Sequence, residues 1–522
     1  IFSDIMYQQY SRKVFWLIII STIIKLLAAA FLELGNDEVY YWTYAIQSDW
    51  NHFDHPPMVG WLIRLTTFNL SWVNEVTIRL GAILCSGFAT WIIFKLGKLL
   101  DSERLGWLAA WIYTLSIYTG FIAGLFILPD SPQMLFWTAS LYIMAHLLLK
   151  REEENLSIWI LLGLMIGLAA LSKVHGLYLW VGFGAFLLFS RIQWLTNWRL
   201  YIGVMVTLIC ISPIVYWNYQ NDFITYRFHS ERVANTSLRW DMLGQEIVGE
   251  ALYQHPFLFA VIAIGLFAAI TNRIRFARKR IRLWLGWMSI PMILVFWGVA
   301  LFNPTLPHWA GPAYIPLYFV AAMYLQKRTN RNVPIILQAS LGLVLIVLIT
   351  GTLLIRFSPV NFGSQQKENY GEYCPTLDMS GWKEFSVSFD ALRKADIAVG
   401  TMKVTDPLVV HKWFPGGHLE FYTARTTGIT LLGVGVLQDL HKFVWLNQER
   451  NTLQPGGDAY FVLPSNLPVD VKKLMGPYFN SIEAPAVIDQ KRGGKTVRYF
   501  YVYRLRNAKS NATAVLPAIN RY

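Results

Sequence analysis

Long apolar runs alternate with short polar segments over the first 356 residues of the chain. A helix needs about 20 mainly apolar residues to cross the hydrocarbon core of a bilayer. The pattern predicts about eleven such helices, within a range of about 9–13, because several runs are short and can be divided differently. The predicted spans are residues 14–32, 74–97, 105–127, 131–149, 157–172, 174–190, 200–217, 256–271, 283–302, 310–326 and 333–355.

The pattern changes in the last part of the chain, where polar residues are mixed with short apolar runs. Ala459–Pro464 and Thr496–Leu505 have the pattern of strands, and residues 382–395 have the spacing of an amphipathic helix. We therefore expect residues 1–356 to form a polytopic α-helical membrane domain. Residues 357–522 are expected to form a small soluble α/β domain.

Composition agrees with this division. Of the 522 residues, 55% are hydrophobic and 15% are charged, whereas soluble proteins carry about 25% charged residues. This balance excludes a disordered chain, a fibrous repeat and a typical soluble enzyme. The cysteines Cys85, Cys210 and Cys374 show no metal-binding spacing. The first apolar run lacks a small-residue cleavage site, so we expect a retained span.

The net charge of +13 fits the excess of basic residues in cytoplasmic loops, so no nucleic-acid partner is needed to explain it. In the predicted topology, basic residues gather in alternate loops, which places the N-terminus in the cytoplasm. The loops 33–73 and 218–255 and the C-terminal domain then lie on the periplasmic or external side. The basic residues are Arg12, Lys13, Lys98, Arg104, Lys150, Arg151, Arg191, Arg199, Arg273, Arg275, Arg278, Lys279, Arg280, Arg282, Lys327, Arg328 and Arg331.

The first external loop carries two acids directly after a span, Asp37 and Glu38, followed by Tyr40, Tyr41 and Trp42. A carboxylate at a membrane edge can act as general base toward a hydroxyl, and aromatic rings can contact a sugar. The alternative is that the acids only stabilise the first turn of a helix.

Farther along the same loop, His52, Asp54 and His55 precede Pro56-Pro57, a pair that suits the start of a helix. Asp54 and His55 are candidates for substrate binding. The three side chains are also weak candidates for a metal site. Fixed cationic side chains can stabilise a phosphate in place of a metal ion, so no metal or other cofactor is required.

Asp130 and Lys173 each lie in a short external turn between two predicted spans. A charged group is costly there, so each has a functional interpretation: an acid for catalysis and a cation for a phosphate. The alternatives are a helix cap for Asp130 and an interfacial lysine for Lys173.

The remaining candidates come from the loop 218–255 and from the segment before the tenth span. Arginine recognises phosphate through two parallel hydrogen bonds, although an amphipathic interfacial helix explains this loop equally well. The candidates are Arg232 and His308 for the donor phosphate, and Trp217, Asn218 and Trp309 for the substrate.

Acids suit the activation of a hydroxyl, cations suit a phosphate leaving group, and aromatic faces suit sugars and isoprenoid chains. The combination at one membrane face predicts transfer of a sugar from a lipid-phosphate carrier to an acceptor hydroxyl.

The same motifs resemble the bacterial branch of the dolichyl-phosphate-mannose protein mannosyltransferase family. They occur in the family's order over most of residues 1–330, and Gly381-Trp382 resembles the start of that branch's C-terminal tail. The motifs are Asp37-Glu38-Val39-Tyr40-Tyr41-Trp42, Phe53-Asp54-His55-Pro56-Pro57, Leu128-Pro129-Asp130-Ser131-Pro132, Leu171-Ser172-Lys173, Trp217-Asn218 with Phe228 and Arg232, and Pro307-His308-Trp309.

The resemblance implies a GT-C fold, similar to the lipid A aminoarabinose transferase, and an inverting transferase that uses a polyprenyl-phosphate sugar at the bacterial inner membrane. It implies that Asp37 is the general base, that Glu38 orients it or the acceptor, and that Asp130 is the second acid. Lys173 and Arg232 would bind the donor phosphate. The β-trefoil insertion of eukaryotic protein mannosyltransferases is absent, as is the WWDYG motif of oligosaccharyltransferases.

The partners expected are the bilayer, the lipid-linked donor and a glycan, lipid or protein acceptor. Two other classes remain open. A lipid-linked glycan ligase or polymerase would use a donor with two phosphates. A lipid-linked sugar flippase or other transporter would place polar residues near the midplane and show internal repeats, and this sequence shows no repeat.

Overall fold

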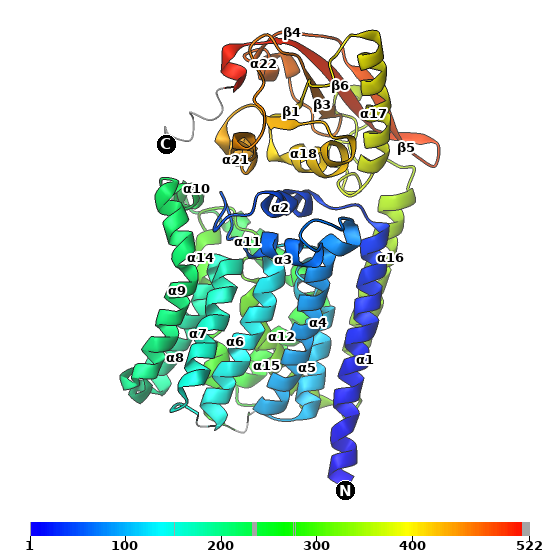
Figure 1. Cartoon of the computed structure of the whole chain (residues 1–522). Coiled ribbons are helices and arrows are strands. Elements are labelled where there is room, and N and C mark those ends of the chain that lie inside the picture. The colour runs from blue at the N-terminus through cyan, green and yellow to red at the C-terminus, as the bar shows by residue number, and fades with distance from the viewer. Residues whose placement is uncertain (1, 151, 232–236, 275, 277, 514–522) are drawn as a thin grey trace. The chain divides into compact units, whose positions relative to one another are not determined.

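The computed structural model describes residues 2–150, 152–231, 237–274, 276 and 278–513, and the chain forms two compact units (Figure 1). We call them the membrane unit and the C-terminal unit. The membrane unit contains Ile1–Leu27, Asp54–Trp72 and Val76–Val347; the C-terminal unit contains Ala28–Phe53, Val73–Glu75 and Leu348–Tyr522.

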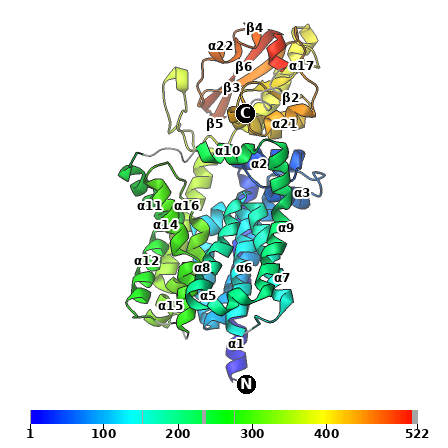
Figure 2. The same ribbon diagram turned by 90° about the vertical axis from the view of Figure 1, so that its left-hand side faces the viewer.

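The membrane unit is built from helices. Its long helices α6, α7 and α9 run side by side in both Figure 1 and Figure 2. The helices are α1 (Phe2–Phe31, which ends in the C-terminal unit), α3 (Met58–Thr66), α4 (Glu75–Leu100), α5 (Glu103–Leu115), α6 (Asp130–Lys150), α7 (Leu156–Ser172), α8 (Tyr178–Ser190), α9 (Trp198–Gln220), α10 (Ile224–Glu231), α11 (Trp240–Tyr253), α12 (Pro256–Ile270), α13 (Lys279–Trp287), α14 (Ile290–Ala300), α15 (Ile315–Arg328) and α16 (Ile335–Phe357).

Each predicted apolar run coincides with helical structure, which confirms a polytopic helical membrane protein. Within the described residues, six helices are long and apolar enough to cross a membrane, or seven if the bent pair α11–α12 is one span. The other predicted spans are shorter or interrupted. Residues 105–127, for example, contain α5 and then the π-helical turn η1 (Ile117–Ile122). The number eleven therefore stays a prediction.

Small residues let the helices approach closely. Gly163 on α7 faces Gly203 on α9, and a Cβ atom at position 163 would lie 2.1 Å from the carbonyl oxygen of Gly203. Such contacts replace the hydrophobic driving force that lipid cannot supply between two apolar helices. The close packing of α7 and α9 fixes the position at which α7 ends, directly before Lys173.

The C-terminal unit contains a mixed sheet with the strand order β2-β1-β3-β6-β4, and β5 also pairs with β6. β1 pairs parallel with β2 and β3, whereas β6 pairs antiparallel with β3, β4 and β5. The strands are β1 (Leu408–Val410), β2 (Leu431–Gly433), β3 (Ala459–Pro464), β4 (Phe479–Ile482), β5 (Ala486–Arg492) and β6 (Lys495–Ala508).

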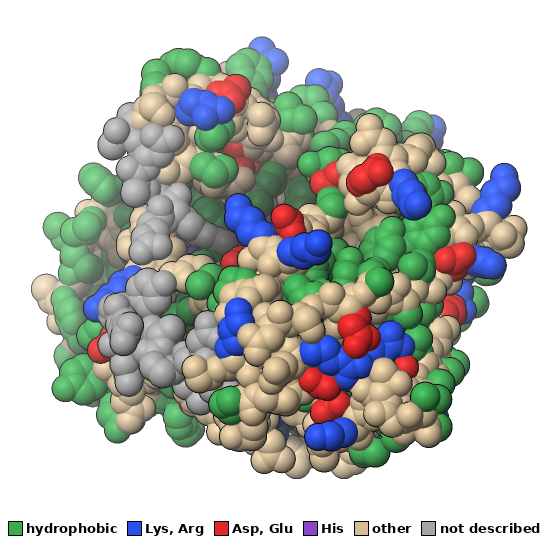
Figure 3. Space-filling view, turned by 90° about the horizontal axis from the view of Figure 1, so that it is seen from above, with side chains coloured by type: hydrophobic (Ala, Val, Ile, Leu, Met, Phe, Trp, Pro, Cys, Tyr) green, Lys and Arg blue, Asp and Glu red, His purple; other side chains and the backbone are tan. Residues whose placement is uncertain are grey.

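Both predicted strands are confirmed as β3 and β6, and the predicted amphipathic helix is confirmed as α17 (Trp382–Val399). The helices α18 (Trp413–His418), α21 (Phe443–Gln448) and α22 (Val471–Met475) also belong to this unit. On the face seen from above, acidic and basic side chains are interspersed (Figure 3).

One early segment packs with these late elements. The sequence predicted residues 33–73 as a loop of the membrane domain, but residues 28–53, with the helix α2 (Asn36–Ile46), belong to the C-terminal unit. α2 packs against α18. The Glu33 carboxylate, only 3% exposed, accepts hydrogen bonds from the backbone N–H groups of Trp382 (2.8 Å) and Lys383 (3.3 Å). Glu33 thus satisfies the first turn of α17, whose N–H groups have no partner inside the helix.

We expect Glu33→Ala to lower stability by about 1–3 kcal/mol, because the buried N–H of Trp382 and the partly buried N–H of Lys383 lose their acceptor. Thermal unfolding of the detergent-solubilised protein measures this as a fall of about 2–4 °C in Tm per kcal/mol. Glu384→Ala is the matched control, since Glu384 is an exposed acid in the first turn of the same helix. Equal losses for both variants would contradict the capping role of Glu33.

Candidate functional site

A buried ion pair joins two of the predicted site residues in the membrane unit. Asp130 is the first residue of α6, and Lys173 directly follows the last residue of α7. The Lys173 Nζ atom lies 3.0 Å and 3.1 Å from the two carboxylate oxygens of Asp130. Lys173 is only 5% exposed and Asp130 only 3%. The fold thus brings together charges that are 43 positions apart in sequence.

Neighbouring side chains hold this pair in place. The Tyr118 hydroxyl, from η1, donates to the Asp130 Oδ1 atom at 2.7 Å, and the Gln133 amide donates to the Lys173 carbonyl oxygen at 3.2 Å. Both carboxylate oxygens of Asp130 are therefore engaged, which favours a role in orienting Lys173. An ammonium group has three N–H donors, so Lys173 can hold Asp130 and still offer one to an anion.

Histidines of the connecting segments, His55 and His308 among them, lie in the field of this pair. Burial, together with the charge of Lys173, lowers the pKa of His308 to about 4, and burial lowers the pKa of His55 to about 4 as well, against the pull of Asp54. Both rings are neutral at pH 7. His308 can therefore donate one hydrogen bond to a phosphate, but at that pH it adds no positive charge.

Asp54 lies beside the same group of side chains, since its carbonyl oxygen hydrogen-bonds to the His229 Nε2 atom at 2.9 Å. The rings of His55 and His229 are 6.3 Å apart. Trp309 lies against Phe296 of α14, with ring centroids 6.0 Å apart. His55, Asp54 and Trp309 are thus placed in the segments that connect helices of the membrane unit.

Other candidates have local packing roles in the structure. Trp217 is buried, and the Asn218 amide, also buried, donates to the Ile214 carbonyl oxygen of its own helix at 3.0 Å. The carbonyl oxygen of Asn218 accepts the N–H of Phe223 in the turn that follows α9. The two residues lie in the last turn of the helix, and their role in substrate binding stays a prediction. Arg232 lies outside the described residues.

Asp37 and Glu38 lie in the first turn of α2, in the C-terminal unit. Asp37 is exposed. Glu38 is buried, and its carboxylate accepts the N–H of Gly35 at 2.9 Å, which closes the start of the helix. Asp37 is thus accessible to a ligand, whereas Glu38 has the local helix-start role that the sequence left open.

Sequence reasoning missed the residues that fix this turn. Asp378 accepts the N–H of Asn36 at 3.1 Å, and the His418 Nε2 atom lies 2.8 Å from the Asn36 side-chain oxygen and 3.3 Å from Asp378. The His418 ring stacks on Trp382 with centroids 4.2 Å apart. Burial lowers the pKa of His418, against the opposing effect of Asp378. No motif marks these residues, because they meet α2 only through the fold.

The aromatic residues of α2 are buried within the C-terminal unit. Tyr40 packs on Trp413, with ring centroids 5.1 Å apart, and Trp42 meets Phe421 edge to face at 5.4 Å. Tyr41 is also buried. Their packing leaves little ring surface for a sugar, so these three side chains serve as a core.

His52 is buried too, 3.7 Å from the Tyr44 ring between centroids. Within the part of the chain that the structure describes, no group of three or more His, Cys, Asp or Glu side chains converges as a metal site requires. His52 belongs to the C-terminal unit and Asp54 and His55 belong to the membrane unit, so the metal site for which they were weak candidates gains no support.

The C-terminal unit has a cleft of about 430 Å³ beside the start of α2. Charged, amide and aromatic side chains line part of it, and apolar side chains line most of the rest, as is usual for ligand sites. Among the lining residues are Asn36, Glu372, Tyr373, Asp378, His411 and Lys412.

Comparison with known proteins finds a family model that matches part of the chain and solved structures with a similar fold. The family model for dolichyl-phosphate-mannose-protein mannosyltransferase matches residues 54–217, a range that contains Asp130 and Lys173. ArnT from Cupriavidus metallidurans bound to undecaprenyl phosphate superimposes with a TM-score of 0.58 at 16% identity, over 94% of this chain and 98% of that chain. The chain has the GT-C fold of ArnT. Apo ArnT gives a TM-score of 0.56 at 15% identity, over 94% and 97% of the two chains.

A curated relative adds a sequence match. The lipid A galacturonosyltransferase RgtD of Rhizobium johnstonii is 28% identical over 284 residues, which are 53% of this chain and 58% of RgtD. The match thus spans little more than half of that relative's length. The resemblance to bacterial GT-C glycosyltransferases that the motifs indicated is confirmed.

Breaking the buried pair is expected to be costly. Asp130→Asn or Lys173→Met alone should lower stability by about 3–5 kcal/mol, since each leaves a buried charge without its partner. The double variant should lose much less than the sum, because no charge remains. Thermal or denaturant unfolding of the four proteins measures this coupling. Asp241→Asn, which breaks the exposed pair with Arg239, is the control and should change Tm little. Additive losses at positions 130 and 173 would contradict the coupling.

Stability should depend on pH through half-buried histidines such as His55 and His308. His55 and His308 have a pKa of about 4 in the folded protein and about 6.5 when unfolded. Between these values the unfolded chain binds more protons, so stability rises with pH from about 4 to 6.5 and their contribution is constant above that.

The His308→Gln variant cannot titrate at this position, so its stability should rise less steeply than that of the wild type over this window. Unfolding midpoints measured at several pH values provide the two slopes. Equal slopes would show that His308 is not held in its neutral form by the fold.

Proposed function

We propose that this protein is a membrane glycosyltransferase that moves a sugar from a polyprenyl-phosphate-sugar donor to an acceptor hydroxyl at the external face, with inversion of the anomeric carbon. The observation that carries the proposal is the buried Asp130–Lys173 pair at the ends of two apolar helices. A fixed cation at that position suits the phosphate of a lipid carrier whose chain lies in the bilayer. The family match over residues 54–217 supports it.

The reaction assigns a task to each group. The acceptor oxygen forms a bond to the anomeric carbon while the bond from that carbon to the phosphate oxygen breaks. Lys173, oriented by Asp130, stabilises the charge that grows on the leaving phosphate, and neutral His308 donates a hydrogen bond. Arg232 is a second candidate for the phosphate, on the strength of the resemblance alone.

Asp37 takes the proton of the acceptor hydroxyl. Its exposure at the start of α2 supports this role, and the contacts of Asp378 and His418 with Asn36 make the turn rigid. A base placed on a fixed turn loses less entropy when the acceptor arrives. The cleft that Asn36 lines offers polar groups to an acceptor, on a surface that is otherwise mainly apolar. Because RgtD is a lipid A galacturonosyltransferase, a lipid A-type glycolipid is the first acceptor to test.

Asp37→Asn should reduce turnover by about 10²–10⁴, the usual contribution of a general base, while donor binding is retained. The assay measures release of polyprenyl phosphate from a panel of polyprenyl-phosphate sugars, with purified protein in nanodiscs and a membrane extract as acceptor source. Donors with two phosphates belong in the panel, since their use would indicate a ligase or polymerase.

Asp222→Asn is the matched control. Asp222 is an exposed acid with φ of 52° in the turn after α9, and asparagine adopts this backbone conformation readily. It should leave turnover unchanged. Undiminished turnover in Asp37→Asn would remove Asp37 as the base, and sugar translocation without release of the carrier would indicate a transporter.

A further inference from the structure

Three arginines line a small cavity in the membrane unit that contains none of the site residues described above. The cavity has a volume of about 280 Å³. It lies where α4 and α6 end, α8 has just ended and α13 begins. Among the described residues, its lining consists of three basic side chains, no acidic side chain and otherwise apolar ones: Arg191, Arg278, Arg280, Leu100, Ala145, Leu148, Leu149, Ile281 and Trp284.

The cavity and the Asp130–Lys173 pair lie at opposite ends of α6. This helix has 21 residues, so its ends are about 30 Å apart, which is the thickness of the hydrocarbon core of a bilayer. Leu149 lines the cavity near one end, and Asp130 begins the other. The arginines are therefore at the level of the opposite leaflet from the ion pair.

The positive charges that line this cavity favour an anionic ligand. Within the described residues, Arg278 and Arg280 form no ion pair, and the Arg278 guanidinium donates to the Leu149 carbonyl oxygen at 3.3 Å. Arg191 lies over the Trp194 ring, 5.5 Å from its centroid. Guanidinium groups recognise phosphate oxygens through parallel hydrogen bonds, and basic pockets between membrane helices suit lipid headgroups.

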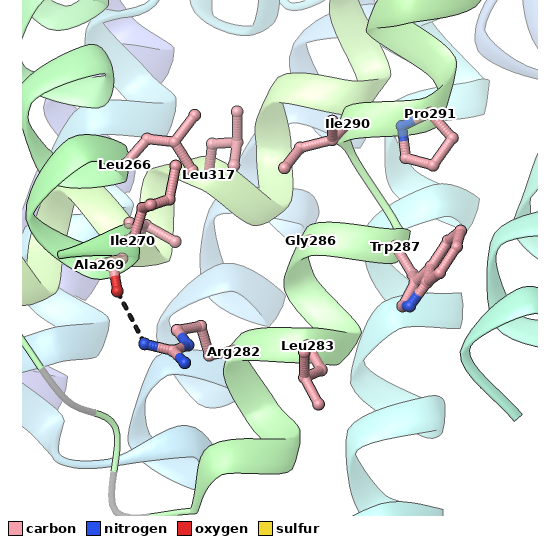
Figure 4. Close-up of a pocket in the computed structure, with 11 residues that line it drawn as sticks. Leu266, Ala269, Ile270, Arg282, Leu283, Gly286, Trp287, Ile290, Pro291 and Leu317 are labelled. Carbon is pink, nitrogen blue, oxygen red and sulfur yellow. Dashed lines mark hydrogen bonds between the residues drawn. The ribbon is translucent and has the colours of Figure 1, made fainter. Parts of the chain in front are cut away.

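The other face of α13 gives a useful contrast (Figure 4). There a groove of about 460 Å³ is lined by apolar side chains, and Arg282 lies at one side of it. The Arg282 Nη1 atom already donates to the Ala269 carbonyl oxygen (2.7 Å) and to the Asn272 side-chain oxygen (2.6 Å). The protein itself thus supplies two hydrogen-bond acceptors to Arg282. In the described part of the chain, Arg278 has one acceptor, the Leu149 carbonyl oxygen, and Arg280 has none.

We propose that the three-arginine cavity binds the phosphate of an anionic phospholipid in the leaflet opposite the Asp130–Lys173 pair. The apolar wall decides in favour of a lipid over a soluble anion. Leu148 and Leu149, which are half-buried, offer contact to the glycerol and first methylene groups of a lipid, which a free phosphate lacks. This site is independent of the proposed transfer reaction, since it shares no residue with it.

The test measures lipid binding to the full-length protein in detergent at about 0.15 M salt, the physiological ionic strength, by native mass spectrometry. Phosphatidylglycerol, phosphatidylcholine and inorganic phosphate are the three ligands. We expect phosphatidylglycerol to bind at ligand concentrations at which phosphatidylcholine and inorganic phosphate do not bind. The triple variant Arg191→Gln/Arg278→Gln/Arg280→Gln should weaken this binding by about tenfold or more, since it removes every charged contact of the cavity.

Two variants keep the test informative if the triple variant does not fold. Arg280→Gln alone changes an exposed side chain on α13 and should weaken binding by about two- to fivefold, the share of one charge-assisted contact. Lys279→Gln is the control, because Lys279 is exposed, carries the same charge and does not line the cavity. Equal losses for Lys279→Gln and Arg280→Gln would overturn the proposal, as would equal binding of phosphatidylcholine or of inorganic phosphate.

Discussion

A buried carboxylate and a buried ammonium group meet where α6 begins and α7 ends, and the membrane unit must keep them together. Either charge alone would be costly in the low dielectric of a helix bundle, so the two helix ends cannot move apart without a large loss of stability. The close contact of Gly163 with Gly203 fixes α7 against α9 and thereby fixes Lys173. The proposed contact with the donor phosphate depends on the same pair, because the ammonium group that Asp130 orients is already desolvated there.

Charge in the membrane unit is concentrated at the two ends of its helices. At one end, the carboxylate of Asp130 balances Lys173, and neutral histidines such as His55 and His308 add polar groups without adding charge. At the other end, three arginines share a cavity with no acid among its described lining residues. The difference matters chemically. At the first site the two charges cancel, so a charged substrate can bind and leave again. In the three-arginine cavity the positive charges are not cancelled by a lining acid, so the cavity suits an anion that stays bound.

The elements that could be predicted from the sequence are those that depend on the order of apolar and polar residues within one short segment. Apolar runs identified the helices, and short strand-like runs identified β3 and β6. The turns containing Asp130 and Lys173 could be recognised because charge is rare between apolar segments. The packing of α2 with the last third of the chain could not be recognised. Glu33 and Trp382 are 349 positions apart, and neither periodicity nor motif connects them. For the same reason, the sequence alone made Tyr40 and Trp42 candidates for sugar binding, although their rings pack on Trp413 and Phe421.

The packing of α2 against late elements also orders events during synthesis. The ribosome makes Glu33 and α2 early, but the first turn of α17, which Glu33 caps, and α18, which packs on α2, follow only after several hundred further residues. At about 5–20 residues per second, a delay on the order of 20–80 seconds separates them. Throughout this time the first helices can enter the membrane, but the turn that carries Asp37 has none of the contacts that fix it. The segment acquires its packed form only after α17 and α18 have been made.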